Sequence, residues 1–301
     1  MKKKWEKSGK DRQGSTGFVK NLAAAVCIIG AASLAFQGAA RIALGMENKG
    51  TEKVATSYST DFTVTGKSSA SPLPEGYTKP EYQLVDNDLE YYKDKKPTSA
   101  DLTREEAAEL GVQGLYRVFG LDMNGKVIEM AYNPAQNSHR ATWEGSWWPD
   151  GRKSSSEAYV QSYFFSVDAI SGELYSIIHD RVLSGTPDTG FDSKLNQNAG
   201  DYEALARETA VKLGAIKGSV RLAEYGGQGY TNNDPDICFN LTGEGGDRAQ
   251  LRFSRYDREL LAVTFDAGMR DMDISEQEAA DFAKRAEEYF RQNPGAESYE
   301  E

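Results

Sequence analysis

The stretch YFFSVDAISGEL at residues 163–174 predicts two strands joined by a tight turn. The aromatic and β-branched residues up to Val167 favour an extended strand. Gly172 supplies the backbone freedom that a tight turn needs, and a second extended run follows it. We therefore predict an antiparallel hairpin made of residues 158–167 and 173–179.

A helix and two more strands precede this hairpin. Thr103 followed by Glu106 is the capping-box pattern, in which the two side chains satisfy free backbone N–H groups at the start of a helix. The apolar spacing carries this helix to Gly120. Two extended runs follow, at 126–132 and 140–148. The pattern predicts one unit of a helix and a four-stranded antiparallel sheet.

The same order of elements recurs in the second half of the chain. A helical pattern at 201–213 precedes four extended runs, which lie at 219–225, 236–242, 249–256 and 259–265. The dipeptide Phe-Ser occurs in the third strand of each half, and the two copies, at residues 165 and 253, are 88 positions apart. We predict an α+β fold with two tandem units, residues 101–183 and 198–268, each with one helix and a four-stranded antiparallel sheet.

A third capping pattern, Ser275 with Glu278, predicts a C-terminal helix over residues 273–293. Its apolar face carries Ala279, Phe282, Ala283, Ala286 and Phe290. Two interpretations stay open: the helix covers an exposed face or edge of a sheet, or it docks on a partner.

The N-terminal region predicts a membrane anchor. Residues 1–21 form a basic tail with seven basic and two acidic side chains, and residues 22–40 carry no charge. Nineteen helical residues span roughly 28 Å, close to the thickness of a bilayer core. The excess of basic residues before the segment predicts a single-pass protein of the cell membrane, with its N-terminus in the cytoplasm and its C-terminal domain extracytoplasmic.

Two further features qualify this N-terminal prediction. Small residues at 33–35 and 38–40 leave open a signal peptide that is cleaved to give a secreted form. Residues 41–100 are rich in Ser, Thr, Lys, Glu and Pro, which predicts a flexible stalk between membrane and first unit. Since the whole chain has a net charge of −11 despite its basic tail, we expect no nucleic-acid partner.

Candidate catalytic and metal-binding residues are few. The two histidines, His139 and His179, lack metal-ligand spacing and are interpreted as surface residues. Cys238 has apolar neighbours and predicts a buried strand thiol, whereas Cys27 lies in the uncharged segment. A fragment of a calcium loop at 232–236 lacks the glycine such loops require. We predict a protein that is not an enzyme, with no cofactor and no metal.

Three tryptophans form the one candidate binding surface. Trp143, Trp147 and Trp148 lie within six positions of one another. In a strand the first two share a face and the third takes the other, so we expect at least one exposed indole. Exposed indoles bind sugars, peptides and partner proteins. The alternative is that the C-terminal helix or the neighbouring unit covers them.

The hairpin sequence resembles the strand, turn and strand signature of PepSY-type domains, in which a capped helix like the one at 103–120 precedes the sheet. The second unit departs from this signature, with YDRE at 256–259 in place of the turn. The resemblance implies a non-catalytic binding or regulatory module of the bacterial envelope, which binds or restrains a peptidase or another envelope protein. A sugar- or ion-binding envelope sensor is the alternative.

Overall fold

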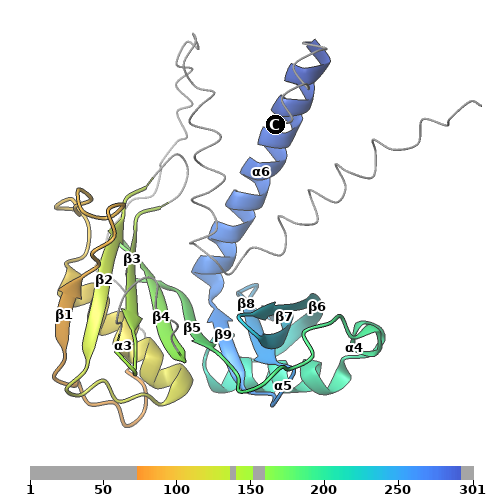
Figure 1. Ribbon diagram of the computed structural model, residues 1–301, viewed down its shortest axis with the longest axis horizontal. Helices are drawn as coiled ribbons and strands as arrows, with labels where there is room; N and C mark the ends of the chain where they lie inside the picture. Colours follow the sequence, from red (N-terminus) through yellow and green to blue (C-terminus); the bar gives the residue numbers. More distant parts are fainter. Residues whose placement is uncertain (1–72, 136–139, 152–159, 293–301) are drawn as a thin grey trace, which may run out of the picture. The chain divides into compact units, whose positions relative to one another are not determined.

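The computed structural model describes residues 73–135, 140–151 and 160–292 (Figure 1). This part of the chain forms nine strands and four helices. The elements are, in chain order, β1 (Gln83–Asp86), α3 (Arg104–Phe119), β2 (Val127–Asn133), β3 (Thr142–Trp147), β4 (Gln161–Asp168), β5 (Leu174–Arg181), α4 (Ser193–Gln197), α5 (Gly200–Lys212), β6 (Val220–Thr231), β7 (Asp234–Gly243), β8 (Arg248–Ser254), β9 (Leu260–Thr264) and α6 (Asp266–Gln292).

All nine strands belong to one mixed sheet, with the order β1-β2-β3-β4-β5-β9-β8-β7-β6. The pair β1 and β2 is parallel, and the other neighbours are antiparallel. The predicted fold of two tandem units with separate four-stranded sheets is therefore wrong. The two halves join at β5 and β9, which would be edges of separate sheets. These strands pair with each other and so satisfy backbone groups that an edge would expose.

The predicted N-terminal organisation also needs correction. Residues 83–86 of the expected flexible stalk form β1 and pair with β2. Within the described residues no helix combines the length and the apolarity needed to cross a membrane. This finding stands against the prediction of a single-pass membrane protein with an extracytoplasmic domain, whose segment 22–40 lies outside the described residues.

Helix α3 begins and ends where the sequence predicts. The Thr103 hydroxyl accepts a hydrogen bond from the Glu106 N–H at 3.2 Å, and the Glu106 carboxylate accepts one from the Thr103 N–H at 2.9 Å. The capping box is therefore confirmed. Gly120 closes the helix in the left-handed conformation, with φ 68°.

Two glycines within α3 serve close packing on the sheet. A Cβ atom at Gly111 would lie 2.2 Å from the Phe165 ring, and one at Gly114 would lie 2.6 Å from Ile177 Cδ1. Gly145 on β3 leaves room for the same ring from another side, since a Cβ there would lie 2.0 Å from Phe165 Cζ. These glycines weaken helix and strand locally but let α3 approach β4 and β5 closely.

The β4–β5 and β8–β9 hairpins share one turn geometry. In the first, the Asp168 N–H donates to Glu173 O; in the second, the Ser254 N–H donates to Glu259 O. The left-handed position of the turn is Gly172 in one and Arg258 in the other, with φ 74° and 69°. The matched positions are 86 residues apart, so the predicted spacing of 88 is two residues out of register. A shift of two residues in the alignment of the two halves keeps each side chain on the same face of its strand. The alternation of apolar residues therefore cannot distinguish a spacing of 86 from one of 88.

The seam between the two halves is short but reinforced. Strands β5 and β9 pair over three positions, with Ile177 opposite Val263 at the centre. Beside the seam the half-buried Arg181 side chain reaches Asp234 at 2.6 Å, Asp257 at 2.8 Å and Glu259 at 2.7 Å. This guanidinium therefore connects the end of β5 to the start of β7 and to the turn between β8 and β9.

The packing of Phe165 predicts the effect of filling Gly111. The Gly111→Ala substitution should lower the free energy of unfolding by about 1–2 kcal/mol, because overpacking a core outweighs the gain in helix propensity. Urea unfolding followed by circular dichroism measures the change, with exposed Glu105→Ala on the same helix as control. A stabilised Gly111→Ala protein would show that helix propensity dominates at this position.

The strained turn at Arg258 gives a second prediction. The free energy of unfolding of Arg258→Gly should exceed that of Arg258→Ala by about 1 kcal/mol. Alanine retains the cost of the left-handed conformation, whereas glycine does not. Both variants lose the Arg258 side chain, so the difference isolates the backbone. Equal thermal stability of the two proteins would contradict a left-handed residue here.

Candidate functional site

Among the residues that the structure describes, the contacts that anchor helix α6 to the sheet lie in its first turns. The Phe265 N–H donates to Tyr175 O on β5 at 2.9 Å, and a Cβ atom at Gly268 would lie 2.5 Å from the same oxygen. Two ion pairs then fix the helix laterally, namely Arg270 with Glu173 at 3.2 Å and Arg248 with Asp273 at 2.5 Å. Beyond these contacts the helix runs on past the sheet (Figure 1).

The outer part of α6 presents an apolar stripe to solvent. Phe282 is 57% exposed and Tyr289 is 54% exposed, one heptad apart on the same side of the helix. On the same side, Ala279 lies one turn before Phe282 and Ala283 lies next to it, and both are exposed. Ala286, between Phe282 and Tyr289, is half-buried. We call these five residues the α6 stripe. Most of the other exposed large apolar side chains lie on different strands and loops.

The start of α6 differs from the prediction. The helix begins at Asp266, directly after β9, and passes without a break through Ser275. The Ser275 hydroxyl donates to Asp271 O within the helix at 3.0 Å and so is not an N-cap. Of the two predicted roles, covering the sheet is ruled out for the described residues after 275, because they are exposed apart from half-buried Ala286.

The three tryptophans do not form one surface. Trp143 is 5% exposed, and its Nε1–H donates to Leu102 O in the core. Trp147 is half-buried and stacks on Tyr163, whereas the Trp148 ring meets Phe164 on the opposite side of the strand. The predicted alternation of faces is confirmed, but sheet neighbours cover most of each indole.

A stack of rings crosses β3, β4 and β5 at their ends near the α3 C-terminus. Trp147 lies 5.4 Å from Tyr163, which lies 4.3 Å from His179, and Phe119 packs edge-on against the last two. His179 is only 9% exposed, so its interpretation as a surface residue is wrong. The other histidine, His139, lies outside the described residues.

One carboxylate pair, with Asp180 on β5 and Asp236 on β7, resembles an acid–base site. Asp180 and Asp236 both lie about 4 Å from the Arg252 guanidinium, at 4.0 and 3.9 Å. Burial is the largest cause that raises the pKa of each carboxyl group, and the Arg252 charge opposes it. Because the cleft described below is lined by other residues, the group is best explained as a charge cluster within the sheet surface.

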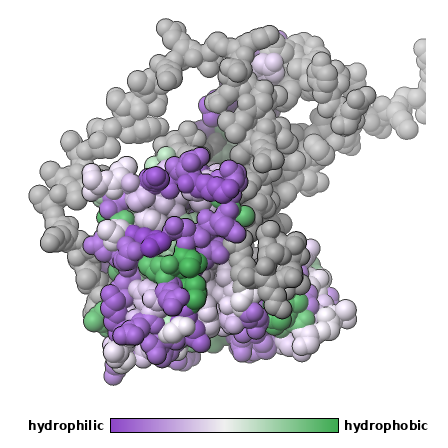
Figure 2. Space-filling model, turned by 60° about the vertical axis from the view of Figure 1, so that its left-hand side comes forward, coloured by the Kyte–Doolittle hydropathy of each residue, from purple (hydrophilic) through white to green (hydrophobic). Residues whose placement is uncertain are grey.

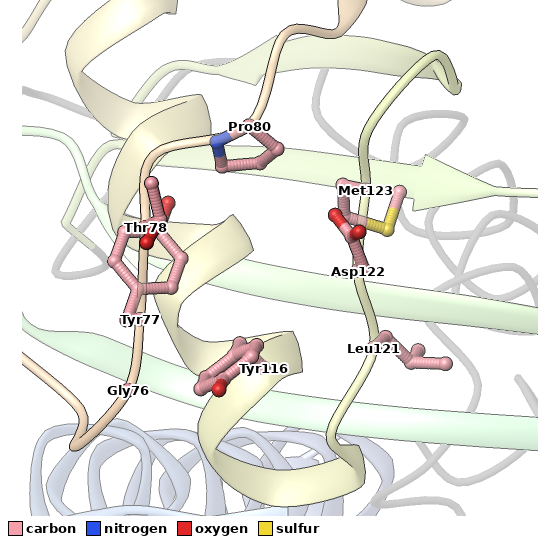
Figure 3. Close-up of a pocket in the computed structure, with 8 residues that line it drawn as sticks. All are labelled: Gly76, Tyr77, Thr78, Pro80, Tyr116, Leu121, Asp122 and Met123. Atoms are coloured by element: carbon pink, nitrogen blue, oxygen red, sulfur yellow. The ribbon is translucent and has the colours of Figure 1, made fainter.

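A shallow cleft of about 290 Å³ lies at the C-terminal end of α3 (Figure 3). The Tyr77 and Tyr116 rings meet edge to face at 5.4 Å, and the Tyr77 hydroxyl donates to Glu109 at 2.7 Å. The cleft thus arises where the 73–82 segment packs on α3, and its volume suits one side chain. Its lining consists of Gly76, Tyr77, Thr78, Pro80, Tyr116, Leu121, Asp122 and Met123.

The remaining candidates from sequence are structural. In the segment 232–236, which resembles part of a calcium loop, the Asp234 carboxylate already binds protein groups. It pairs with Arg181 and accepts a hydrogen bond from the Ser254 hydroxyl at 2.5 Å. In the described part of the chain no group of three or more His, Cys, Asp or Glu could hold a metal ion. Cys238 is a half-buried strand thiol, and burial raises its pKa to about 11, which keeps it protonated at neutral pH.

Figure 2 shows that the side bearing β1 and β2 is mostly hydrophilic, with small separated hydrophobic patches.

Comparison with protein-family models, with curated proteins and with solved structures found no match. The resemblance to PepSY-type domains therefore stays a prediction.

Buried His179 gives a pH-dependent prediction. Burial, together with the nearby Arg181 charge, lowers the pKa of His179 from 6.5 to about 4, and the charges of Asp234 and Asp257 partly oppose this shift. Between pH 6.5 and 4 His179 is therefore protonated in the unfolded chain and neutral in the folded one. The stabilisation, up to about 3 kcal/mol, is complete above pH 6.5 and is lost as pH falls toward 4.

The His179→Phe variant keeps a ring against Tyr163 and removes the titrating group. Between pH 6.5 and 5 its free energy of unfolding should fall less steeply than that of the unaltered protein, as measured by urea unfolding at each pH. Parallel pH profiles would refute a depressed His179 pKa.

Proposed function

We propose that this protein is a non-catalytic binding module that associates with protein partners through the α6 stripe. One observation carries the proposal: a helix fixed to the sheet at its first turns exposes aromatic and small side chains along one side for the rest of its length. Leaving such side chains in water forgoes roughly 1.5–3 kcal/mol for each large one, which burial in a complex would recover.

The stripe has the composition of an interface centre. Phe282 and Tyr289 are aromatic anchors of the kind that dominate binding energies. The small residues Ala279, Ala283 and Ala286 surround them and let a partner approach the helix backbone closely. Charged residues occupy the other sides of the helix, for example Lys284 and Glu288. An amphipathic helix of this pattern binds a groove or another helix in its partner.

The anchoring at the sheet supports the proposal. Because Arg248, Arg270 and Gly268 hold the first turns, the helix is presented in a defined direction and loses less freedom on binding than a tethered peptide would. The PepSY resemblance implies the same class of function, with a peptidase or another protein as the partner restrained.

Site-specific photo-crosslinking tests this function. With p-benzoylphenylalanine in place of Phe282, the full chain should form covalent protein adducts on irradiation in its native cells. The same residue in place of Ala280 should form few, because 280 is exposed on the opposite side of α6. Gel electrophoresis and mass spectrometry measure the adducts.

A second substitution distinguishes specific binding from crosslinks that form by chance collision. Adding Ala279→Glu should abolish the adducts from position 282, because a charge one turn away cannot be buried in an apolar interface. Equal labelling from positions 280 and 282, or none from 282, would reject the α6 stripe as a binding surface.

A further inference from the structure

We infer that the partner of the α6 stripe is the α6 helix of a second copy of this chain, packed in antiparallel orientation. The inference rests on the proposed function and names the occupant of the same surface. Three features of α6 lead to it: the spacing of its apolar residues, the alternation of their sizes and the distribution of its charges.

The spacing indicates a helix as the partner. Apolar or small residues recur at alternating intervals of three and four, at Met272, Ser275, Ala279, Phe282, Ala286 and Tyr289. An average interval of about 3.5 residues is the spacing by which two helices pair, and Ala283 of the α6 stripe flanks this seam. The helix is continuous over this whole seam.

The sizes along the seam favour the antiparallel orientation. In a parallel pair identical residues meet, which would place Phe282 against Phe282 and alanine against alanine. In an antiparallel pair centred between residues 280 and 281, Ala279 of each copy faces Phe282 of the other. The Phe282 ring of each copy then lies over a small residue, while Tyr289 of each copy faces the flexible Met272 side chain of the other.

The charges favour the same orientation. Residues 271–281 carry five acidic side chains and no basic one, whereas residues 282–292 carry three basic and two acidic side chains. A parallel pair would bring the two acidic segments together. An antiparallel pair sets each acidic segment beside the partner's basic-containing segment, which lowers the repulsion between two chains of net charge −11.

The mass of the full chain in solution tests self-pairing. Sedimentation equilibrium should give a reversible dimer of the 33.1 kDa chain. Phe282→Glu should weaken dimerisation at least about 100-fold, because it places a charge in the seam on both copies. Ala280→Glu adds the same charge on the opposite side of the helix and should leave the dimer intact. Unchanged circular dichroism excludes misfolding of either variant.

The orientation is tested by a distance between two labels. Nitroxides on Glu288→Cys, in a chain carrying Cys27→Ser and Cys238→Ala, are offset by about 22 Å along the helix axis in the antiparallel pair and have no axial offset in a parallel one, so the antiparallel pair gives the longer distance. Double electron–electron resonance measures this distance. A short distance would overturn the antiparallel arrangement.

The outcomes separate this inference from the proposed function. A chain that is monomeric at all concentrations, or a dimer that persists in Phe282→Glu, would overturn self-pairing. If a monomeric chain still gives adducts from position 282 with a different protein, the binding function stands and the second copy is rejected. If position 282 gives no adduct at all, both fail.

Discussion

The pairing of β5 with β9 is the constraint on which the rest of the structure depends. Each of these strands ends a run of four antiparallel neighbours, and each would be an edge if the halves were separate. Pairing removes both edges and merges the halves into one sheet. Since only three positions pair directly, the Arg181 ion pairs supply the additional connection, and the one to buried Asp234 is sensitive to loss of its partner.

The same seam determines where the binding helix points. One residue separates the end of β9 from the start of α6, so the strand leads straight into the helix. Tyr175 on β5 receives the Phe265 N–H and excludes any side chain at Gly268. The first half of the chain therefore orients a helix that belongs to the second, and the stripe that carries the proposed function is a product of both halves.

Local signals in the sequence were reliable where a few adjacent residues suffice. The capping box at Thr103, the turn at Gly172 and the alternation of Trp143, Trp147 and Trp148 follow from backbone hydrogen bonding and strand geometry within short segments. The polar composition before residue 100 predicts a stalk, but two tyrosines in this segment pack it on the folded part of the chain. Tyr77 and Tyr82 both donate to Glu109, which is how this segment packs on α3.

The sequence by itself determined the helix and strand runs, the amphipathic character of the last helix and the candidate residues on it, since these depend on spacing along one chain. Only the tertiary structure decided that the two sheets are one, that His179 is buried and that the α6 stripe is exposed. Each of these depends on contacts between residues far apart in sequence, such as Ile177 with Val263. No local pattern records them, because an edge strand and a central strand, or a covered and an uncovered helix face, can have the same sequence periodicity.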